Sequence, residues 1–367
     1  MSSSNILAGT QLKLRHVHHI SQPKALENTW KETIEKELLH RGRMNRQLPS
    51  ALMYDEAGLE LWAKIVDLPD YYIPTAEMDS LSKWGQGVIE ELGEGKALID
   101  LGSGKVIGML GDFEKAKCRV YYFALDMNAE KLEESMRRIP SSWNHVQPYA
   151  ICGTFDEARI WAQNLPMPKC FLSLGSTIGN DNPEYMAEEL AQWSAALGPD
   201  DRMLIGLDSC QDEDLVLAAY NDNGNVWHDF IRNGFLHSNR VLGVDWFWPD
   251  DWKIFGTVDH QPFRHKFVAE ARRPIQFPSL GLTFEAGDRV FTLESYKYEL
   301  NDIINHFTAG GLEVRAMWRA RAAPVSQDHY LLAKHEPESG SEESVINTSV
   351  DDRLVAPFGD NAVATTA

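Results

Sequence analysis

The sequence has few of the features that mark secreted, membrane-spanning or metal-binding chains. Its four cysteines form no CxxC pair, and three lie in or beside apolar segments; they are Cys118, Cys152, Cys170 and Cys210. Free thiols in such places behave as small hydrophobes, so we expect reduced core cysteines. No apolar run reaches the roughly 20 residues of a membrane helix, and the polar start of the chain lacks a signal-peptide pattern. We therefore expect a cytoplasmic protein.

Basic residues are scarce as well. The chain has 35 Lys and Arg against 54 Asp and Glu, which gives a net charge of −19. Nucleic acids and anionic lipid surfaces bind through clustered Lys and Arg, so neither nucleic acid nor membrane is an expected partner. Scattered histidines such as His228, His237, His260 and His265 lack the spacing of metal ligands. We expect solvated or structural roles for them, and no metal.

The apolar residues that are present indicate an α/β protein. Strand-like runs at Ala97–Leu101, Val120–Leu125, Cys170–Leu174 and Met203–Leu207 are separated by helical patterns, which is typical of βαβ units and a parallel sheet. From Trp252 onward the pattern alternates, which indicates antiparallel strands. A chain of 367 residues with 43% hydrophobic content can bury two modest cores. We predict a Rossmann-like core with a second, α+β substrate domain.

The domain boundaries follow from these patterns. The sequence does not determine the oligomeric state, and we expect a monomer. We expect a flexible N-terminus at 1–20, a helical part of the substrate domain at 21–90, the core at 91–211, an insertion that completes the substrate domain at 212–298, the end of the core at 299–335 and a disordered tail at 336–367.

A glycine-rich turn follows the first predicted strand of the core. The strand ends near Asp100, Gly102-Ser103-Gly104 forms the turn, and the next strand ends on Asp126. An acidic residue at that tip suits a ribose diol, because a carboxylate can accept from both hydroxyls. A P-loop is excluded, since Lys105 is followed by Val106 rather than Ser or Thr. The turn fits a nicotinamide dinucleotide or S-adenosyl-L-methionine equally.

Two details favour S-adenosyl-L-methionine. Asp100 lies where it would attract the cationic methionine part of that cofactor and repel a pyrophosphate. Between the second and third of these strand-like runs, Thr154 and Phe155 offer a hydroxyl and a ring face for an adenine. An NAD(P)-dependent oxidoreductase remains the alternative from another class of enzyme.

A second turn, Phe171–Asn180 (FLSLGSTIGN), is the most informative segment. An apolar strand runs into a turn of small residues, in which Gly175 allows the backbone to approach a ligand and Asn180 offers an amide. Such a turn is typical of a binding site at the carboxyl edge of a parallel sheet.

Seven motifs occur together between about residues 50 and 335. They are Met53-Tyr54-Asp55, Leu68–Pro74, Leu101–Gly104, Leu174–Asn180, Ile205–Asp208, Ala219–Asp222 and Ser295–Tyr298. In combination they resemble the family of S-adenosylmethionine-dependent α-N-methyltransferases that act on amino acids. That family includes the histidine trimethyltransferases of ergothioneine biosynthesis and fungal enzymes acting on tryptophan or 4-dimethylallyltryptophan. The resemblance implies a Rossmann-like methyltransferase core and a small-molecule amino-acid substrate.

The resemblance also implies roles for single residues. Asn180 and Tyr220 correspond to positions that hold the substrate carboxylate, Tyr54 and Tyr71 to tyrosines that line the amino-acid pocket, and Gly175 to a position that approaches the reacting group. Methyl transfer to an amine is an in-line displacement, so the enzyme has mainly to hold a neutral amine roughly 3 Å from the methyl carbon. We expect Tyr54, with Ser295 or a water, to position that amine.

One departure from the histidine enzymes concerns substrate choice. Leu293 stands where they carry a glutamate that accepts from the imidazole, and Phe267 stands where a methionine borders that ring. Leucine cannot accept a hydrogen bond, and Glu294 should face the other side of its strand. The sequence therefore favours tryptophan or a 4-prenylated tryptophan, as in fungal secondary metabolism. Histidine is the alternative, and so is a relative that has kept the fold but lost turnover.

Overall fold

An eight-stranded sheet forms the largest part of the protein. The computed structural model describes residues 12–20, 26–40, 46–102, 106–178, 180, 183–322 and 325–336. The first six strands in the sheet order run parallel, and the last two run antiparallel to their neighbours. In sheet order the strands are β1 (Val17–His19), β4 (Val146–Cys152), β3 (Val120–Asp126), β2 (Ala97–Leu101), β5 (Lys169–Ser173), β6 (Arg202–Asp208), β13 (Val325–Lys334) and β12 (Leu312–Ala322).

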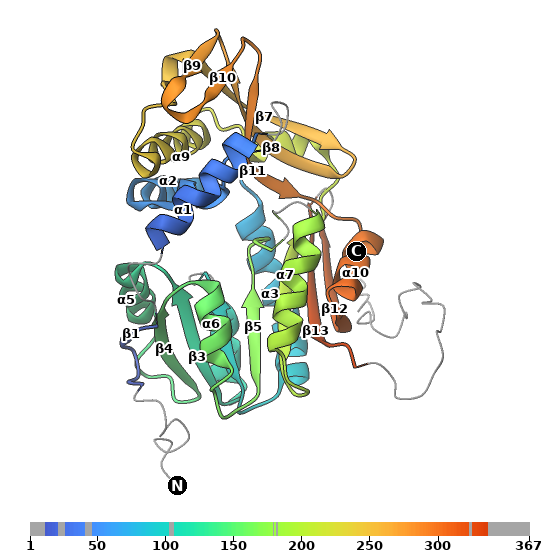
Figure 1. Cartoon of the computed structure of the whole chain (residues 1–367). Helices are drawn as coiled ribbons and strands as arrows, with labels where there is room; N and C mark the ends of the chain where they lie inside the picture. Colours follow the sequence, from blue (N-terminus) through green and yellow to red (C-terminus); the bar gives the residue numbers. More distant parts are fainter. Residues whose placement is uncertain are drawn as a thin grey trace, which may run out of the picture.

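Helices cover both faces of this sheet (Figure 1). Ile99 packs with the helices of one face and Leu98 with those of the other, since side chains alternate along a strand. Burial on both faces explains why the central strands are almost wholly apolar. The first face carries α6 (Phe155–Ala162), α7 (Pro183–Ala196) and α10 (Leu300–Ala309), and the second carries α3 (Ile73–Leu92), α4 (Ile107–Lys115) and α5 (Ala129–Arg138).

The strand order reverses between β2 and β5. The chain builds outward from β2 through β3 and β4 on one side, and from β5 through β6 on the other. Ligands of open α/β sheets bind outside the carboxyl ends of the strands at such a reversal. The two glycine turns singled out in the sequence follow these two strands and therefore lie side by side.

A second, smaller region adjoins this edge and has its own apolar cluster (Figure 1). It is built on a three-stranded antiparallel sheet and a short hairpin. Its helices come from before and after the core segment. The elements are α1 (Leu26–Glu35), α2 (Glu56–Val66), α8 (Glu213–Ala219), α9 (Val226–Leu242), β7 (Trp252–His260), β8 (Phe263–Ala271), β11 (Arg289–Tyr296), the hairpin β9 (Ile275–Phe277) and β10 (Leu282–Phe284), and the short helices Lys36–His40, Ser50–Tyr54, Pro249–Asp251 and Pro278–Leu280.

The fold class predicted from the sequence is confirmed, and two details differ. Strand β1 and the hairpin of β9 and β10 were not expected, because three-residue strands carry too little pattern to recognise. The sequence indicated strands at Arg315–Ala320 and His329–Lys334, and β12 and β13 are longer than that. Residues 1–11 and the expected tail from 337 onward lie outside the described residues, and the domain boundaries stay a prediction. Among the described residues, no helix is long and apolar enough to cross a membrane.

Candidate active site

The predicted cofactor residues meet at the carboxyl edge of three neighbouring strands. Gly102 follows β2 with a φ of 84°, which favours glycine, and its N–H donates to Leu125 at the end of β3. A Cβ built on Gly102 would lie 3.9 Å from the ring of Phe155, so the residue expected against an adenine faces the glycine turn. Asp126 ends β3 on the same edge.

The acidic and hydroxyl groups around that edge have distinct roles in the fold. Asp100 is buried and accepts from the Tyr122 hydroxyl at 2.8 Å. Asp126 accepts from the Asn128 N–H at 2.8 Å, and burial raises the pKa of its carboxyl. Thr154 caps α6, accepting from the backbone N–H of residue 157. Ser103 and Gly104 lie outside the described residues.

Three tyrosines expected at the amino-acid site come together from three parts of the chain. Tyr54 ends a short helix, Tyr71 precedes α3, and Tyr220 follows α8. The rings of Tyr71 and Tyr220 meet edge to face at 5.8 Å. Burial and the nearby Tyr220 hydroxyl raise the pKa of both Tyr54 and Tyr71, so these phenols stay protonated at physiological pH.

A buried ion pair lies beside the tyrosines. Lys297 Nζ lies 2.7 Å from the carboxylate of Asp208, and neither side chain is exposed. Burial alone would lower the pKa of Lys297, but the adjacent Asp208 carboxylate raises it above its ordinary value. The Tyr220 hydroxyl donates to Ser295 Oγ at 2.7 Å, and Lys297 donates to the same oxygen at 2.9 Å. The Tyr72 hydroxyl donates to Asp208 at 2.7 Å.

This network fixes two predicted residues, Tyr220 and Ser295, through three that the sequence did not single out: Tyr72, Asp208 and Lys297. Each of the three lies inside a motif that carried the resemblance, but no local pattern indicates that they bond to one another. Two bonds of the network join distant segments: 136 positions separate Tyr72 from Asp208, and 75 separate Tyr220 from Ser295.

Hydrogen bonds to two neighbouring elements, α3 and β6, hold the turn after β5. Gly175 has a φ of 85°, and its N–H donates to the buried Glu77 at 2.8 Å. Ser176 Oγ accepts from the backbone N–H of Asp208, which links the turn to the ion pair. Asn180 Oδ1 is buried and has no hydrogen-bond partner among the described residues. An unpaired buried acceptor is costly, so this oxygen is suited to a ligand that donates a hydrogen bond.

Leu293 lies in a β-bulge of β11. Thr292 pairs with Phe267 and Glu294 with Lys266, so Leu293 is the extra residue, and its φ of 42° is rare for a leucine. Its side chain belongs to the apolar cluster of the smaller region, which also contains Tyr71, Tyr220 and Phe267. Strain of this kind is often found at functional sites.

Glu294 does not share that environment. Its carboxylate accepts from Arg264 at 2.8 Å and from the Tyr296 hydroxyl at 2.8 Å. Leu293 and Glu294 therefore have different surroundings, one apolar and one charged.

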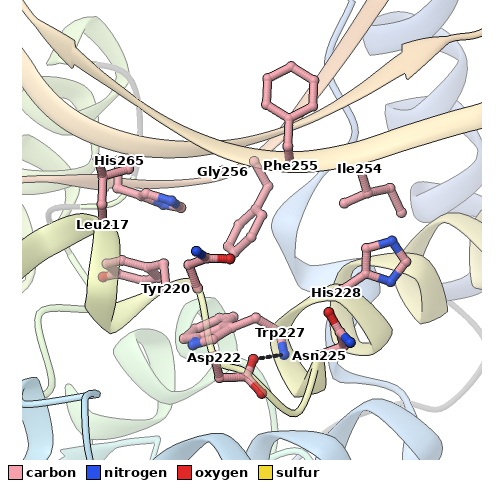
Figure 2. A pocket seen from close by; sticks show the side chains of 12 residues that line it. Leu217, Tyr220, Asp222, Asn225, Trp227, His228, Ile254, Phe255, Gly256 and His265 are labelled. Carbon is pink, nitrogen blue, oxygen red and sulfur yellow. Dashed lines mark hydrogen bonds between the residues drawn. The ribbon is translucent and has the colours of Figure 1, made fainter.

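A pocket of about 340 Å³ opens beside Tyr220 and Phe267 (Figure 2). Trp227 forms part of its wall and contacts the rings of Tyr71, Tyr220 and Phe267 at 5.0 to 5.5 Å. No sequence pattern singled out Trp227. Of the solvated or structural roles expected for His265, the structure shows the structural one, since the side chain is buried and its ring stacks on Tyr220 at 4.2 Å. The remaining lining residues are Leu217, Asn221, Asp222, Asn225, His228, Ile254, Phe255 and Gly256.

The fold and this edge define a Rossmann-like enzyme that binds a nucleotide-type cofactor beside a buried, tyrosine-lined site. A family model described as histidine-specific methyltransferase, S-adenosylmethionine-dependent, matches residues 30–331, and the chain belongs to that family. The cofactor is therefore S-adenosyl-L-methionine, and the oxidoreductase alternative is set aside. The open backbone at Gly102, the carboxylate of Asp126 and the partly exposed ring of Phe155 fit such a cofactor.

Curated relatives include enzymes with different names. Ergothioneine biosynthesis protein 1 of Neurospora crassa is 35% identical over 282 residues, covering 74% of this chain and 32% of that protein. N-methyltransferase dtpB of Aspergillus flavus is 29% identical over 291 residues, covering 74% of this chain and 81% of the relative. The 4-dimethylallyltryptophan N-methyltransferase easF of Claviceps fusiformis is 29% identical over 306 residues, covering 76% of this chain and 86% of that relative. The chain thus spans about a third of the Neurospora protein and most of the other two.

The buried ion pair yields a test of the site's architecture. Replacing Lys297 by methionine leaves the Asp208 carboxylate buried without its cation, and such changes cost about 3–5 kcal/mol of the free energy of unfolding. We expect that loss in urea denaturation, and partial recovery in the double variant Lys297→Met, Asp208→Asn. The exposed pair of Lys115 and Asp112 is the control, and Lys115→Met should cost less than about 1 kcal/mol. Equal losses at positions 297 and 115 would contradict the assignment.

Proposed function

We propose that this enzyme methylates the α-amino group of a free aromatic amino acid, most specifically L-tryptophan or a 4-prenylated tryptophan. The observation that carries the proposal is the meeting of Tyr54, Tyr71 and Tyr220 beside an apolar wall in which position 293 is a leucine. When bound, S-adenosyl-L-methionine supplies the methyl group. The protein's own part is to bind the amino acid, orient the amine and exclude water.

Different polar residues bind the carboxylate and the amine of the substrate. The NH2 of the Asn180 amide and the Tyr220 hydroxyl donate to the carboxylate, for which the Tyr220 proton turns away from Ser295 Oγ, and Gly175 leaves room for the reacting group. Tyr54, with Ser295 or a water, orients the amine. Because burial raises the pKa of Tyr54, its phenol acts as a neutral hydrogen-bonding group and not as a strong base. Correct placement supplies most of the rate gain in such a displacement.

The apolar residues select the side chain. Leu293 and Phe267 offer no hydrogen bond, and the nearest carboxylate on the strand, Glu294, is already bonded to Arg264 and Tyr296. A buried imidazole would lose a partner there, at about 1–3 kcal/mol. An indole gains apolar contact instead.

Histidine is the second candidate, and two observations favour it. The matching family is described as histidine-specific, and the Neurospora relative is named for ergothioneine biosynthesis. Under this reading the chain would place its hydrogen bonds to the imidazole at a residue other than 293.

A panel of amino acids tests the proposal. The enzyme is incubated with methyl-labelled S-adenosyl-L-methionine and, separately, histidine, tryptophan, 4-dimethylallyltryptophan and tyrosine, and the products are identified by mass spectrometry. We expect methylation on the α-nitrogen, with tryptophan or its prenylated form preferred. Preference for histidine would support the second candidate, and binding of the cofactor without any methylated product would indicate a relative that has lost turnover.

The Asn180 amide gives a prediction for the carboxylate. Asn180→Ala removes a charge-assisted hydrogen bond worth about 1.5–3 kcal/mol, so the KM for the amino acid should rise roughly 10- to 100-fold. The dissociation constant of S-adenosyl-L-methionine, measured by calorimetry, should stay within about twofold. A weaker affinity for the cofactor with an unchanged KM for the amino acid would place Asn180 at the other ligand.

Position 293 gives a prediction for substrate choice. Leu293→Glu places a hydrogen-bond acceptor in the apolar wall, so the ratio of kcat/KM for histidine over tryptophan should rise about tenfold or more. Leu293→Gln is the matched control, since it adds polarity without a negative charge and should shift the ratio less. Both variants are checked for an unchanged melting temperature of the fold. An identical substrate ranking in a folded Leu293→Glu variant would show that residue 293 does not face the substrate ring.

A further inference from the structure

Glu77 is a buried carboxylate that has no part in the binding roles given above. It lies in the second turn of α3, and only 2% of its surface is exposed. A buried charge is costly unless its oxygens find hydrogen bonds or a cation. The partners of this carboxylate therefore indicate its role.

The sheet makes room for the carboxylate at Gly206. That glycine lies opposite His329 in the pairing of β6 with β13, and a Cβ built on it would lie 2.3 Å from Glu77 Oε1. A glycine inside a strand weakens the strand and often marks a place where another group comes close. Here the group that comes close is Glu77, and any side chain at position 206 would push the carboxylate away.

The strongest contact of this carboxylate is with the turn after β5. The Gly175 N–H donates to Glu77 Oε1 at 2.8 Å. The buried side chains beside it are farther away, since His329 Nε2 lies 3.7 Å and Gln327 Nε2 3.5 Å from the same oxygen. Ser80 Oγ lies 3.0 Å from His329 Nδ1 and orients that ring. A hydrogen bond to an ionised acceptor is roughly twice as strong as one between neutral groups.

This bond links two parts of the candidate site. The turn carries Gly175, with its φ of 85°, and leads to Asn180. Helix α3, which carries Glu77, begins at Ile73, directly after Tyr71 and Tyr72. The contact between Glu77 and Gly175 therefore fixes the turn relative to the helix that begins beside the tyrosines.

We propose that Glu77 is a positioning residue for methyl transfer, which holds the turn in place by accepting from the Gly175 N–H. It acts through the turn and takes no part in the displacement itself. The inference rests on the proposed function, since that function places the amino acid at Gly175 and Asn180. Misplacement of reacting groups by about 1 Å can lower a rate roughly 100-fold, so a loosened turn has a measurable effect.

The experiment compares Glu77→Leu with Glu77→Gln. Leucine accepts no hydrogen bond, whereas the amide oxygen of glutamine can still accept from the Gly175 N–H. We expect kcat to fall about 100-fold in Glu77→Leu and to stay within about fivefold of the wild type in Glu77→Gln. Methyl transfer is measured with the amino acid of the panel that the wild-type enzyme methylates best. The dissociation constant of S-adenosylhomocysteine, measured by calorimetry, should be unchanged in both variants.

Hydrogen exchange gives a readout that does not depend on turnover. Amide exchange is followed by mass spectrometry in peptides that cover Phe171–Ile178. Loss of a hydrogen bond worth about 1.4 kcal/mol corresponds to roughly tenfold faster exchange at Gly175, which we expect in Glu77→Leu but not in Glu77→Gln. Glu91→Leu, at an exposed position of the same helix, is the matched control and should change neither exchange nor kcat. Urea denaturation verifies that each variant is folded.

The outcomes separate this inference from the proposed function. Faster exchange and a lower kcat in Glu77→Leu, both restored in Glu77→Gln, support it. Unchanged exchange in Glu77→Leu, or an unchanged kcat despite faster exchange, overturns it. So does a Glu77→Gln variant as impaired as Glu77→Leu, since the negative charge and not the hydrogen bond would then be required. A wild-type enzyme that methylates no amino acid would defeat the proposed function, and the exchange rates would still decide whether Glu77 holds the turn.

Discussion

The ion pair of Lys297 and Asp208 is the constraint on which the site depends. Asp208 ends strand β6 of the large sheet, and Lys297 follows strand β11 of the small one, so one buried contact joins the two regions. Two charges inside a protein are tolerated only when each finds its partner and its remaining hydrogen bonds. The hydroxyls of Tyr72, Tyr220 and Ser295 complete that requirement, and their positions are therefore fixed by the electrostatics of the pair.

Around this pair the site separates into a polar half and an aromatic half. The polar half lies at the carboxyl edge of the parallel sheet, where Gly175 and Asn180 follow β5. The aromatic half comes from segments on either side of the core in the sequence, with Tyr54 and Tyr71 before it and Tyr220, Trp227 and Phe267 after it. Tyr220 belongs to both halves, since its hydroxyl enters the network while its ring contacts Tyr71, Trp227 and His265.

Local patterns predicted the strands and glycine turns well, because apolar runs and turn residues act over a few positions. Strand β2 has the bounds that the sequence indicated, Ala97–Leu101. Contacts between distant segments were not predictable in the same way. Nothing near Lys297 indicates that Asp208 neutralises it, and His265 looked like an ordinary strand residue until its stacking on Tyr220 was seen. The bulge at Leu293 could not be predicted from the sequence either, since it depends on how β11 pairs with β8.

That bulge has an evolutionary consequence. The ladder resumes directly after the extra residue, with Glu294 opposite Lys266 and Ser295 opposite His265. Position 293 is thus not needed for the pairing of β11 with β8. A mutation or even a deletion there leaves the pairing of its neighbours in place. Descendants of one ancestral sequence could exchange this residue repeatedly while Ser295 and Lys297 kept their partners. Diversification of ring preference would then require few compensating changes elsewhere.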